Sequence, residues 1–85
     1  MGSPTLIKAN RCTAIAYIYV ANQMFDKSEE YFLKAFKLDP QRSIDIILLA
    51  QHYEKIGQPN NKIRLLKEAL KTHPEDTSIL KEMQK

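Results

Sequence analysis

The chain of 85 residues is poor in glycine, with two in all, and it has one cysteine and no tryptophan. The lone Cys12 excludes an intramolecular disulfide and a cysteine-based zinc site, and it is typical of a reducing compartment. We therefore expect a cytoplasmic protein. Two glycines are also too few to build the glycine-rich loops that cradle phosphate groups.

An excess of charge of one sign is also lacking. Thirteen basic and ten acidic residues are interspersed, and the formal net charge is +3. A nucleic-acid interface usually gathers its basic residues on one face, so we do not expect nucleic acid as a partner. The most apolar stretch, residues 12–21, is too short to cross a bilayer, which takes about 20 residues. We expect no membrane association.

Residue patterns typical of enzymes are not visible either. His52 and His73 do not form the His-x3-His or Glu-x2-His patterns of metal ligands. Cys12 lies on an apolar helical stripe without a base beside it that would activate a nucleophile. Glu29 and Glu30 are adjacent, so on a helix they point about 100° apart. We therefore predict a protein that is not an enzyme and has no catalytic residue, metal or cofactor.

What the sequence does contain is helical periodicity. Apolar residues recur at i, i+3, i+4 and i+7, as at Cys12, Ile15, Ala16 and Tyr19, and no strand-like alternation occurs. Four prolines divide the chain, because proline breaks a helix interior. The pattern predicts five helices, at residues 4–22, 26–38, 43–56, 60–72 and 77–85. The connections between them are short, so successive helices should be antiparallel neighbours.

Local residues indicate where these helices begin and end. Ser3, followed by proline, is typical of a helix N-cap, and Asp76 can cap the last helix. Asp26 and Glu29 have the spacing of a capping box. Gly57 is placed to end the third helix in the left-handed conformation.

A repeat of 34 residues connects the two halves of the chain. The segment YFLKAFKLDP at residues 31–40 returns as LLKEALKTHP at residues 65–74. Identical residues at this spacing are Ala16/Ala50, Tyr19/Tyr53, Ala35/Ala69, Lys37/Lys71 and Pro40/Pro74. The chain thus contains two copies of one helix–turn–helix unit and the start of a third.

This unit resembles the tetratricopeptide repeat, whose 34 residues carry small, aromatic and proline residues at these places. Repeat 1 is expected at 9–42 and repeat 2 at 43–76, with a capping or truncated third-repeat helix at 77–85. The resemblance implies a single all-α domain, residues 1–85, in which antiparallel helical hairpins stack as a short right-handed α-solenoid. Two repeats fall below the roughly three that such stacks usually need. We therefore expect marginal stability, or help from self-association or from further repeats of a longer parent protein.

The chain departs from the family pattern at two places. Gln23 stands where glycine is common in the hairpin turn, so Asn22 or Gln23 has to supply the helix cap. Lys62 stands where alanine is usual. Either its stem lies along apolar surface with the ammonium in water, or the second hairpin is splayed.

The resemblance further implies an interaction module or scaffold, with the first helices of the repeats lining a concave groove for a peptide or helix of a partner protein. The groove residues are predicted to be Thr13, Tyr17, Val20, Ala21, Ile44, Ile47, Leu48, Gln51, Glu54 and Lys55. One subclass binds carboxylate tails of chaperones through lysine, asparagine and arginine. Those places hold Thr13, Tyr17 and Leu48 here, so chaperone tails are not expected.

Several predicted groove residues are apolar and lie off the main core stripe, namely Tyr17, Val20, Ile44 and Ile47. Exposed apolar patches usually mark contact surfaces, so the partner is predicted to offer a hydrophobic segment. Two alternatives stay open: the same surface contacts other repeats of a longer parent, or it contacts a second copy in a homo-oligomer. RNA binding, as in the related pentatricopeptide repeats, is less favoured because no base-reading side chains are visible.

Overall fold

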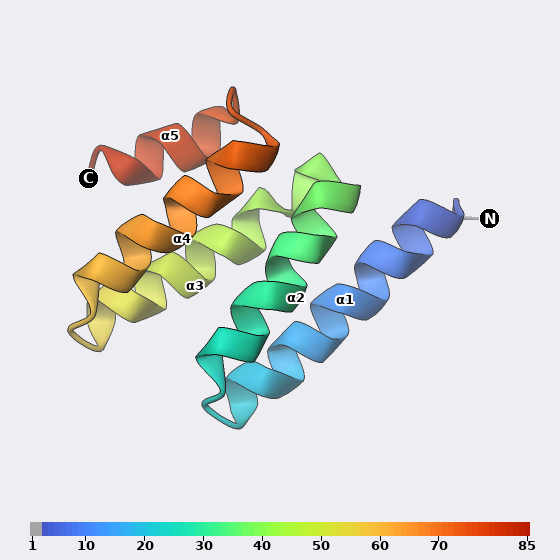
Figure 1. The fold of residues 1–85 in the computed structure, drawn as a ribbon, viewed down its shortest axis with the longest axis horizontal. Helices are drawn as coiled ribbons and strands as arrows, with labels where there is room; N and C mark the ends of the chain where they lie inside the picture. The colour runs from blue at the N-terminus through green and yellow to red at the C-terminus, as the bar shows by residue number, and fades with distance from the viewer. Residues whose placement is uncertain (1–2) are drawn as a thin grey trace.

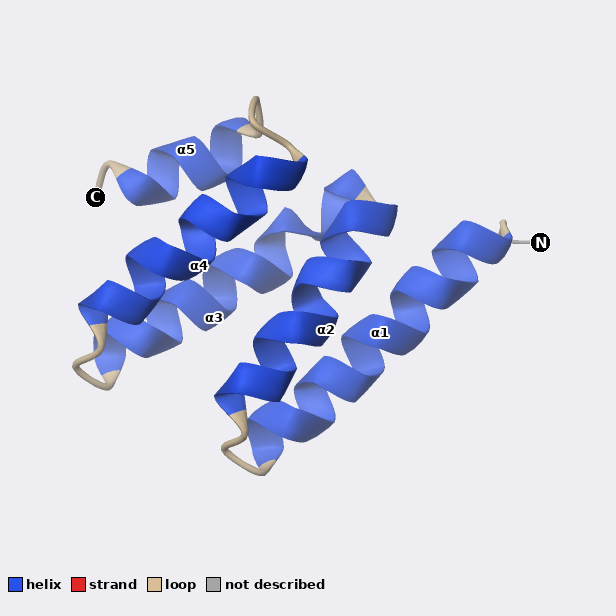
Figure 2. Ribbon diagram, viewed as in Figure 1, coloured by secondary structure: helices blue, strands red, loops and turns tan. Residues whose placement is uncertain are grey.

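The computed structural model describes residues 3–85, so the first two residues of the predicted domain lie outside the described part. These residues form helices and short turns, without any strand (Figure 2). The elements are α1 (Pro4–Ala21), α2 (Phe25–Leu38), the 3-10 turn η1 (Pro40–Arg42), α3 (Ser43–Lys55), α4 (Pro59–Thr72) and α5 (Thr77–Met83). The five predicted helices are confirmed with small shifts at their ends.

The helices pack as antiparallel hairpins, which confirms the predicted fold class. α1 packs against α2, and α3 packs against α4. α2 contacts both helices of the second hairpin, and α5 contacts both from the other side. Figure 1 shows the consequence: the two termini lie at opposite ends of the stack, and α1 has a neighbouring helix on one side only.

Two predicted N-caps are present. The Ser3 hydroxyl accepts a hydrogen bond of 3.2 Å from the Leu6 amide, and the Asp76 carboxylate accepts one of 2.9 Å from the Ile79 amide. Each satisfies an amide that has no partner inside its helix. These residues therefore set where α1 and α5 begin.

The predicted capping box at Asp26 and Glu29 is wrong. α2 begins at Phe25, its N-cap is Met24, and no side chain caps it. The Glu29 side chain instead points into the interior, where it accepts hydrogen bonds from Tyr53 and Arg64. Glu29 lies on the buried face of α2, where a carboxylate is costly unless it has donors, so its side chain takes these tertiary hydrogen bonds and not a local cap.

The two hairpin turns share one geometry. Gly57 ends the second-repeat turn with φ +79°, and Gln23 takes the same left-handed region with φ +59°. In both turns an amide donates to the carbonyl five residues earlier: Met24 to Tyr19 at 2.9 Å and Gln58 to Tyr53 at 2.8 Å. This is the bond of a Schellman cap. The predicted role of Gly57 is confirmed, and Gln23 fills the equivalent place without being glycine.

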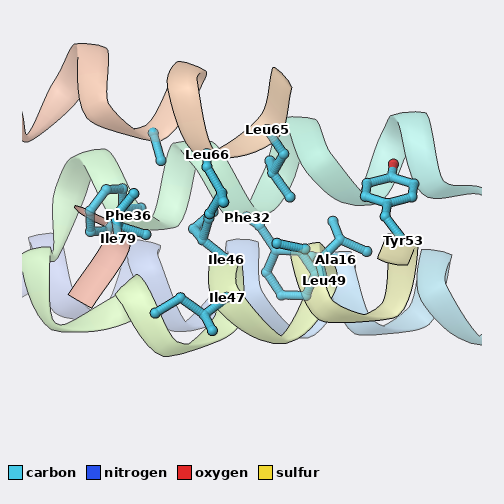
Figure 3. Close-up of a cluster of buried hydrophobic side chains, with 12 residues drawn as sticks. Ala16, Phe32, Phe36, Ile46, Ile47, Leu49, Tyr53, Leu65, Leu66 and Ile79 are labelled. Atoms are coloured by element: carbon cyan, nitrogen blue, oxygen red, sulfur yellow. The ribbon is translucent and has the colours of Figure 1, made fainter. Parts of the chain in front are cut away.

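The main core lies between the two hairpins (Figure 3). Its largest fully buried side chains include Phe32 and Phe36 of α2, Ile46 of α3 and Leu66 of α4. They are the apolar residues that the 34-residue repeat places on matching faces. The core thus consists mostly of side chains through which one repeat packs against the next.

Ile47 corrects one part of the predicted groove. The residue is 8% exposed and belongs to this core cluster together with Ile79 of α5. Because α5 packs against α3 as well as α4, α3 is covered on more sides than its periodicity predicts. Ile47 is therefore a core residue.

Lys62 follows the first of its two predicted alternatives for the stem only, because its ammonium is paired with a carboxylate and does not lie in water. The residue is 5% exposed, and its ammonium donates to the Glu54 carboxylate at 2.8 Å. Its stem lies in the interior while Glu54, whose side chain is 59% exposed, brings the charge pair to the surface. The second hairpin stays closed around it.

A candidate binding pocket between the first helices of the repeats

A small pocket of about 130 Å³ lies where α1 and α3 meet over α2. We call it the interhelix pocket, and it is lined by Tyr17, Val20, Phe32, Asp45, Leu48, Leu49 and His52. Three of these, Tyr17, Val20 and Leu48, are predicted groove residues. Larger open depressions at the hairpin turns and before α5 are lined mainly by polar residues. An apolar hollow with a few polar groups is the usual form of a binding site.

Tyr17 forms one side of the interhelix pocket and connects the two repeats. Its hydroxyl donates a hydrogen bond of 2.5 Å to Asp45 Oδ1, and its ring meets Phe32 edge-on with centroids 5.0 Å apart. Burial and this hydrogen bond raise the pKa of Tyr17 to about 12. Its hydroxyl therefore stays protonated and remains a donor. The residue is nevertheless 43% exposed, so it can also contact a partner.

Asp45 is the charged group of the interhelix pocket. It lies in the first turn of α3, where the helix dipole favours a carboxylate. The residue is only 7% exposed, and among the described residues its Oδ2 has no hydrogen-bond donor. A buried carboxylate oxygen without a donor is costly. The pocket thus combines apolar walls with one incompletely satisfied negative charge.

Other predicted groove residues are exposed but lie outside the lining of this pocket. Ala21, Ile44 and Lys55 are all exposed, and Ile44 is 56% exposed. Ile44 and Leu48 are one helical turn apart on α3. An apolar surface thus continues from the pocket toward the start of α3.

Two predicted groove residues are buried. Thr13 is 8% exposed, and its hydroxyl donates to the Ala9 carbonyl at 3.0 Å within α1. Ile47 is in the core, as described above. Neither presents its side chain to a partner in this structure.

Gln51 and Glu54 are already engaged within the chain. Gln51 donates to the Glu82 carboxylate at 3.1 Å, which ties α3 to α5, and Glu54 accepts from Lys62. Burial by itself raises the pKa of Glu82, but hydrogen bonds from Gln51 and Lys85 outweigh it and hold the pKa below its usual value. These polar groups hold the second hairpin and α5 together.

The sequence analysis missed Asp45 as a site residue. An acidic residue at the start of a helix is normally explained by the helix dipole, so the position of Asp45 does not by itself indicate a binding site. One signal was available: Asp45 is the only charged residue in the apolar stretch 43–50. His52, which the sequence does not place in a metal-ligand pattern, lines the pocket while its ring packs on Phe25 with centroids 5.0 Å apart.

Within residues 3–85, no three histidine, cysteine or acidic side chains cluster in a way that could hold a metal ion. None of the helices in this part of the chain is both long and apolar enough to span a membrane.

The stacked hairpins make this chain a helical-repeat protein. Residues 9–42 match the family model of the tetratricopeptide repeat, so the chain contains a repeat of this family. The match coincides with the predicted repeat 1, and α3 and α4 form a second hairpin with the same turn geometry. Such repeats are typically non-catalytic and bind other proteins. Comparisons with curated proteins and with solved structures gave no significant match.

Proposed function

We propose that this chain is a protein-interaction module that holds an apolar segment of a partner protein across α1 and α3. The interhelix pocket is the observation that carries the proposal. Both first helices contribute to it, so a segment lying there contacts both repeats at once. The tetratricopeptide repeat supports protein binding in general, and the apolar pocket supports the choice of α1 and α3 as the surface.

Exposed apolar side chains around the pocket support the same proposal. Tyr17, Leu48 and Ile44 are 43%, 49% and 56% exposed. Tyrosine is a frequent anchor of protein interfaces because it buries a large ring and keeps a polar tip. Covering these side chains would remove apolar surface from water, which favours association.

The test compares two matched variants. Leu48→Gln changes the pocket, and Ile63→Gln changes a similarly exposed apolar residue of α4 outside it, at 49% and 44% exposure. Immobilised wild-type and variant proteins capture partners from the source cells, and mass spectrometry quantifies them. A captured protein is then purified and titrated against all three forms.

We expect Leu48→Gln to weaken binding about tenfold, since burial of a leucine side chain contributes 1.5–3 kcal/mol or about one to two powers of ten. Ile63→Gln should bind like the wild type, and circular dichroism should show all three equally helical. Equal capture by both variants would place the partner site elsewhere.

A second candidate function, self-association, is favoured by the exposed side of α1. Ile15 and Ile18 are 37% and 61% exposed. Their counterparts 34 residues later are Leu49, which is 3% exposed, and His52, which packs on Phe25 of repeat 1. α1 thus presents to solvent the face that α3 uses to bind a preceding hairpin. A second copy of the chain can cover it.

A further inference from the structure

The interhelix pocket contains a negative charge that nothing in its own wall neutralises. Asp45 is the only acidic residue of the lining, and no lysine or arginine of the described residues lines it. Arg42, the nearest basic residue along the chain, pairs with Asp39 at 3.4 Å. Its charge offsets part of the rise in the pKa of Tyr17, so it lies near the pocket, but among the described residues it gives Asp45 no hydrogen bond. In the part of the chain that the structure describes, the only hydrogen bond to the Asp45 carboxylate comes from Tyr17 and reaches Oδ1. Oδ2 therefore lacks a donor among residues 3–85.

This arrangement differs from the other buried carboxylate that joins the two repeats. Glu29 also accepts a hydrogen bond from a tyrosine, Tyr53, but Arg64 then neutralises it through both oxygens at 2.8 and 2.7 Å. The comparison defines what the Asp45 site lacks, which is a basic group with several N–H donors. A buried carboxylate is stabilised most by such a partner.

The shape of the interhelix pocket suits one side chain. An apolar cavity of about 150 Å³ can hold a benzene molecule, and this pocket measures about 130 Å³. That volume fits the end of a lysine or arginine and is too small for a whole peptide segment. Tyr17 and Phe32 are aromatic walls, and aromatic faces attract cations. Leu48 and Leu49 can pack along the methylene stem of such a residue.

Resting on the proposed function, we infer that the partner segment places a basic side chain, lysine or arginine, in the interhelix pocket against Asp45. Tyr17 borders this site, because the residue is 43% exposed and its hydroxyl donates to the same carboxylate. The partner is then a segment with apolar residues around one basic residue. Specificity comes from Asp45, and much of the contact area comes from Ile44 and Leu48.

The experiment uses n-butylguanidinium, which carries the head group of arginine, and n-butylurea, a neutral molecule of similar shape. Each is titrated into the purified chain while NMR follows the backbone amides of Asp45, Leu48 and Leu49. We expect saturable shifts with n-butylguanidinium in the millimolar range and much weaker shifts with n-butylurea. Added salt should weaken the binding of the cation. Equal binding of the two molecules, or no saturable shift, would overturn the inference.

Two variants separate capture of a cation from a merely structural role. Asp45→Asn keeps the shape and the acceptor for Tyr17, and it should raise the dissociation constant for n-butylguanidinium about tenfold or more. Tyr17→Phe keeps the aromatic wall but removes the hydrogen bond that competes for the carboxylate, so it should bind the cation more tightly than wild type. If both variants lose binding alike, Asp45 acts only through the fold, and the inference is wrong.

A charge-matched control and the captured partner complete the test. Glu75→Gln removes one negative charge from an exposed residue outside the pocket and should bind the cation like wild type. If a partner is lost with Leu48→Gln but kept with Asp45→Asn, the proposed function stands and the inference fails. If n-butylguanidinium binds at Asp45 but no partner depends on Leu48, the inference about the pocket stands and the proposed function fails.

Discussion

The two hairpin turns each need one residue in the left-handed conformation, and the two repeats use different residues for it. The hairpin turn of repeat 2 uses Gly57 for its left-handed residue, whereas that of repeat 1 uses Gln23. A side chain in this region brings Cβ close to the backbone and costs roughly 1–2 kcal/mol. Asn22 contributes a bond of 2.9 Å from its side-chain amide to the Ile18 carbonyl, so the end of α1 is also supported by a side chain.

Gln23→Gly should therefore stabilise the protein. The gain is about 0.5–1 kcal/mol, because relief of the left-handed strain is partly offset by the greater freedom of glycine in the unfolded chain. Urea denaturation followed by circular dichroism measures it. The reverse change at the other turn, Gly57→Gln, should destabilise by about the same amount, since a Cβ at Gly57 meets nothing within 4 Å and only the backbone is strained. A loss of stability in Gln23→Gly would contradict this account of the turn.

At the scale of helices, two hydrogen bonds from a tyrosine hydroxyl to a carboxylate join the repeats. In one the tyrosine belongs to repeat 1, and in the other it belongs to repeat 2. Tyr17 of α1 donates to Asp45 of α3, and Tyr53 of α3 donates to Glu29 of α2. The second bond extends to α4, because Arg64 binds both oxygens of Glu29. That hydrogen bond to Glu29 raises the pKa of Arg64 further above its already high value. Three helices thus share one buried carboxylate.

Removing Arg64 should destabilise this junction. Glu29 is 5% exposed, so Arg64→Gln leaves a buried carboxylate without its cation. The expected cost is about 1–3 kcal/mol, kept below the value for a fully buried pair because the Arg64 side chain is 49% exposed. Urea denaturation of Arg64→Gln measures this cost. Lys67→Gln, an exposed change on the same helix, should stay within about 0.5 kcal/mol of wild type.

A double-mutant cycle tests whether the cost comes from the pair itself. Glu29→Gln removes the charge that Arg64 neutralises, so Arg64→Gln should cost much less in that background. Additive effects of the two changes would show that Arg64 acts through other contacts, such as its 3.4 Å hydrogen bond to Asn61.

For the whole molecule, the two ends of the stack are unequal. α5 covers the second hairpin and buries Ile79 completely, although it has no partner helix of its own and leaves Leu80 39% exposed. α1 has no such cover, and Ile7, Ile15 and Ile18 are 46%, 37% and 61% exposed. In a stack each repeat stabilises only its neighbours. Association through the exposed face of α1 would therefore bury the most apolar surface and stabilise a short stack most.

The self-association candidate predicts a mass that rises with concentration in static light scattering. Ile18→Glu places a charge in the middle of the exposed face of α1 and should keep the protein monomeric, because burying an unpaired charge is unfavourable. Ile63→Glu on α4 should associate like wild type. A wild-type mass that stays that of one chain over the whole concentration series would remove this candidate.

The sequence predicts correctly those features that depend on residues close together in the chain, and it fails where the interacting residues are far apart. The local features are confirmed, because each acts within a few residues. They are the helical spacing, the proline positions, the N-caps Ser3 and Asp76, and the turn residue Gly57. The 34-residue repeat also predicted the hairpins and most of the core. Asp26 and Glu29 were misassigned because their spacing satisfies a local pattern, while the preferred partners of Glu29 lie on α3 and α4.

The sequence by itself therefore determined the helices, their pairing and the class of repeat, because periodicity and chain breaks are local and occur twice. Only the tertiary structure decided which first-helix residues are accessible. It buried Ile47 beneath the packing of α5, closed Lys62 onto Glu54, and brought Tyr17 within hydrogen-bonding distance of Asp45, 28 residues away. The candidate binding pocket arises from contacts between repeats. No pattern within one repeat predicts that Asp45 becomes buried there with a hydrogen bond to only one of its two carboxylate oxygens among the described residues.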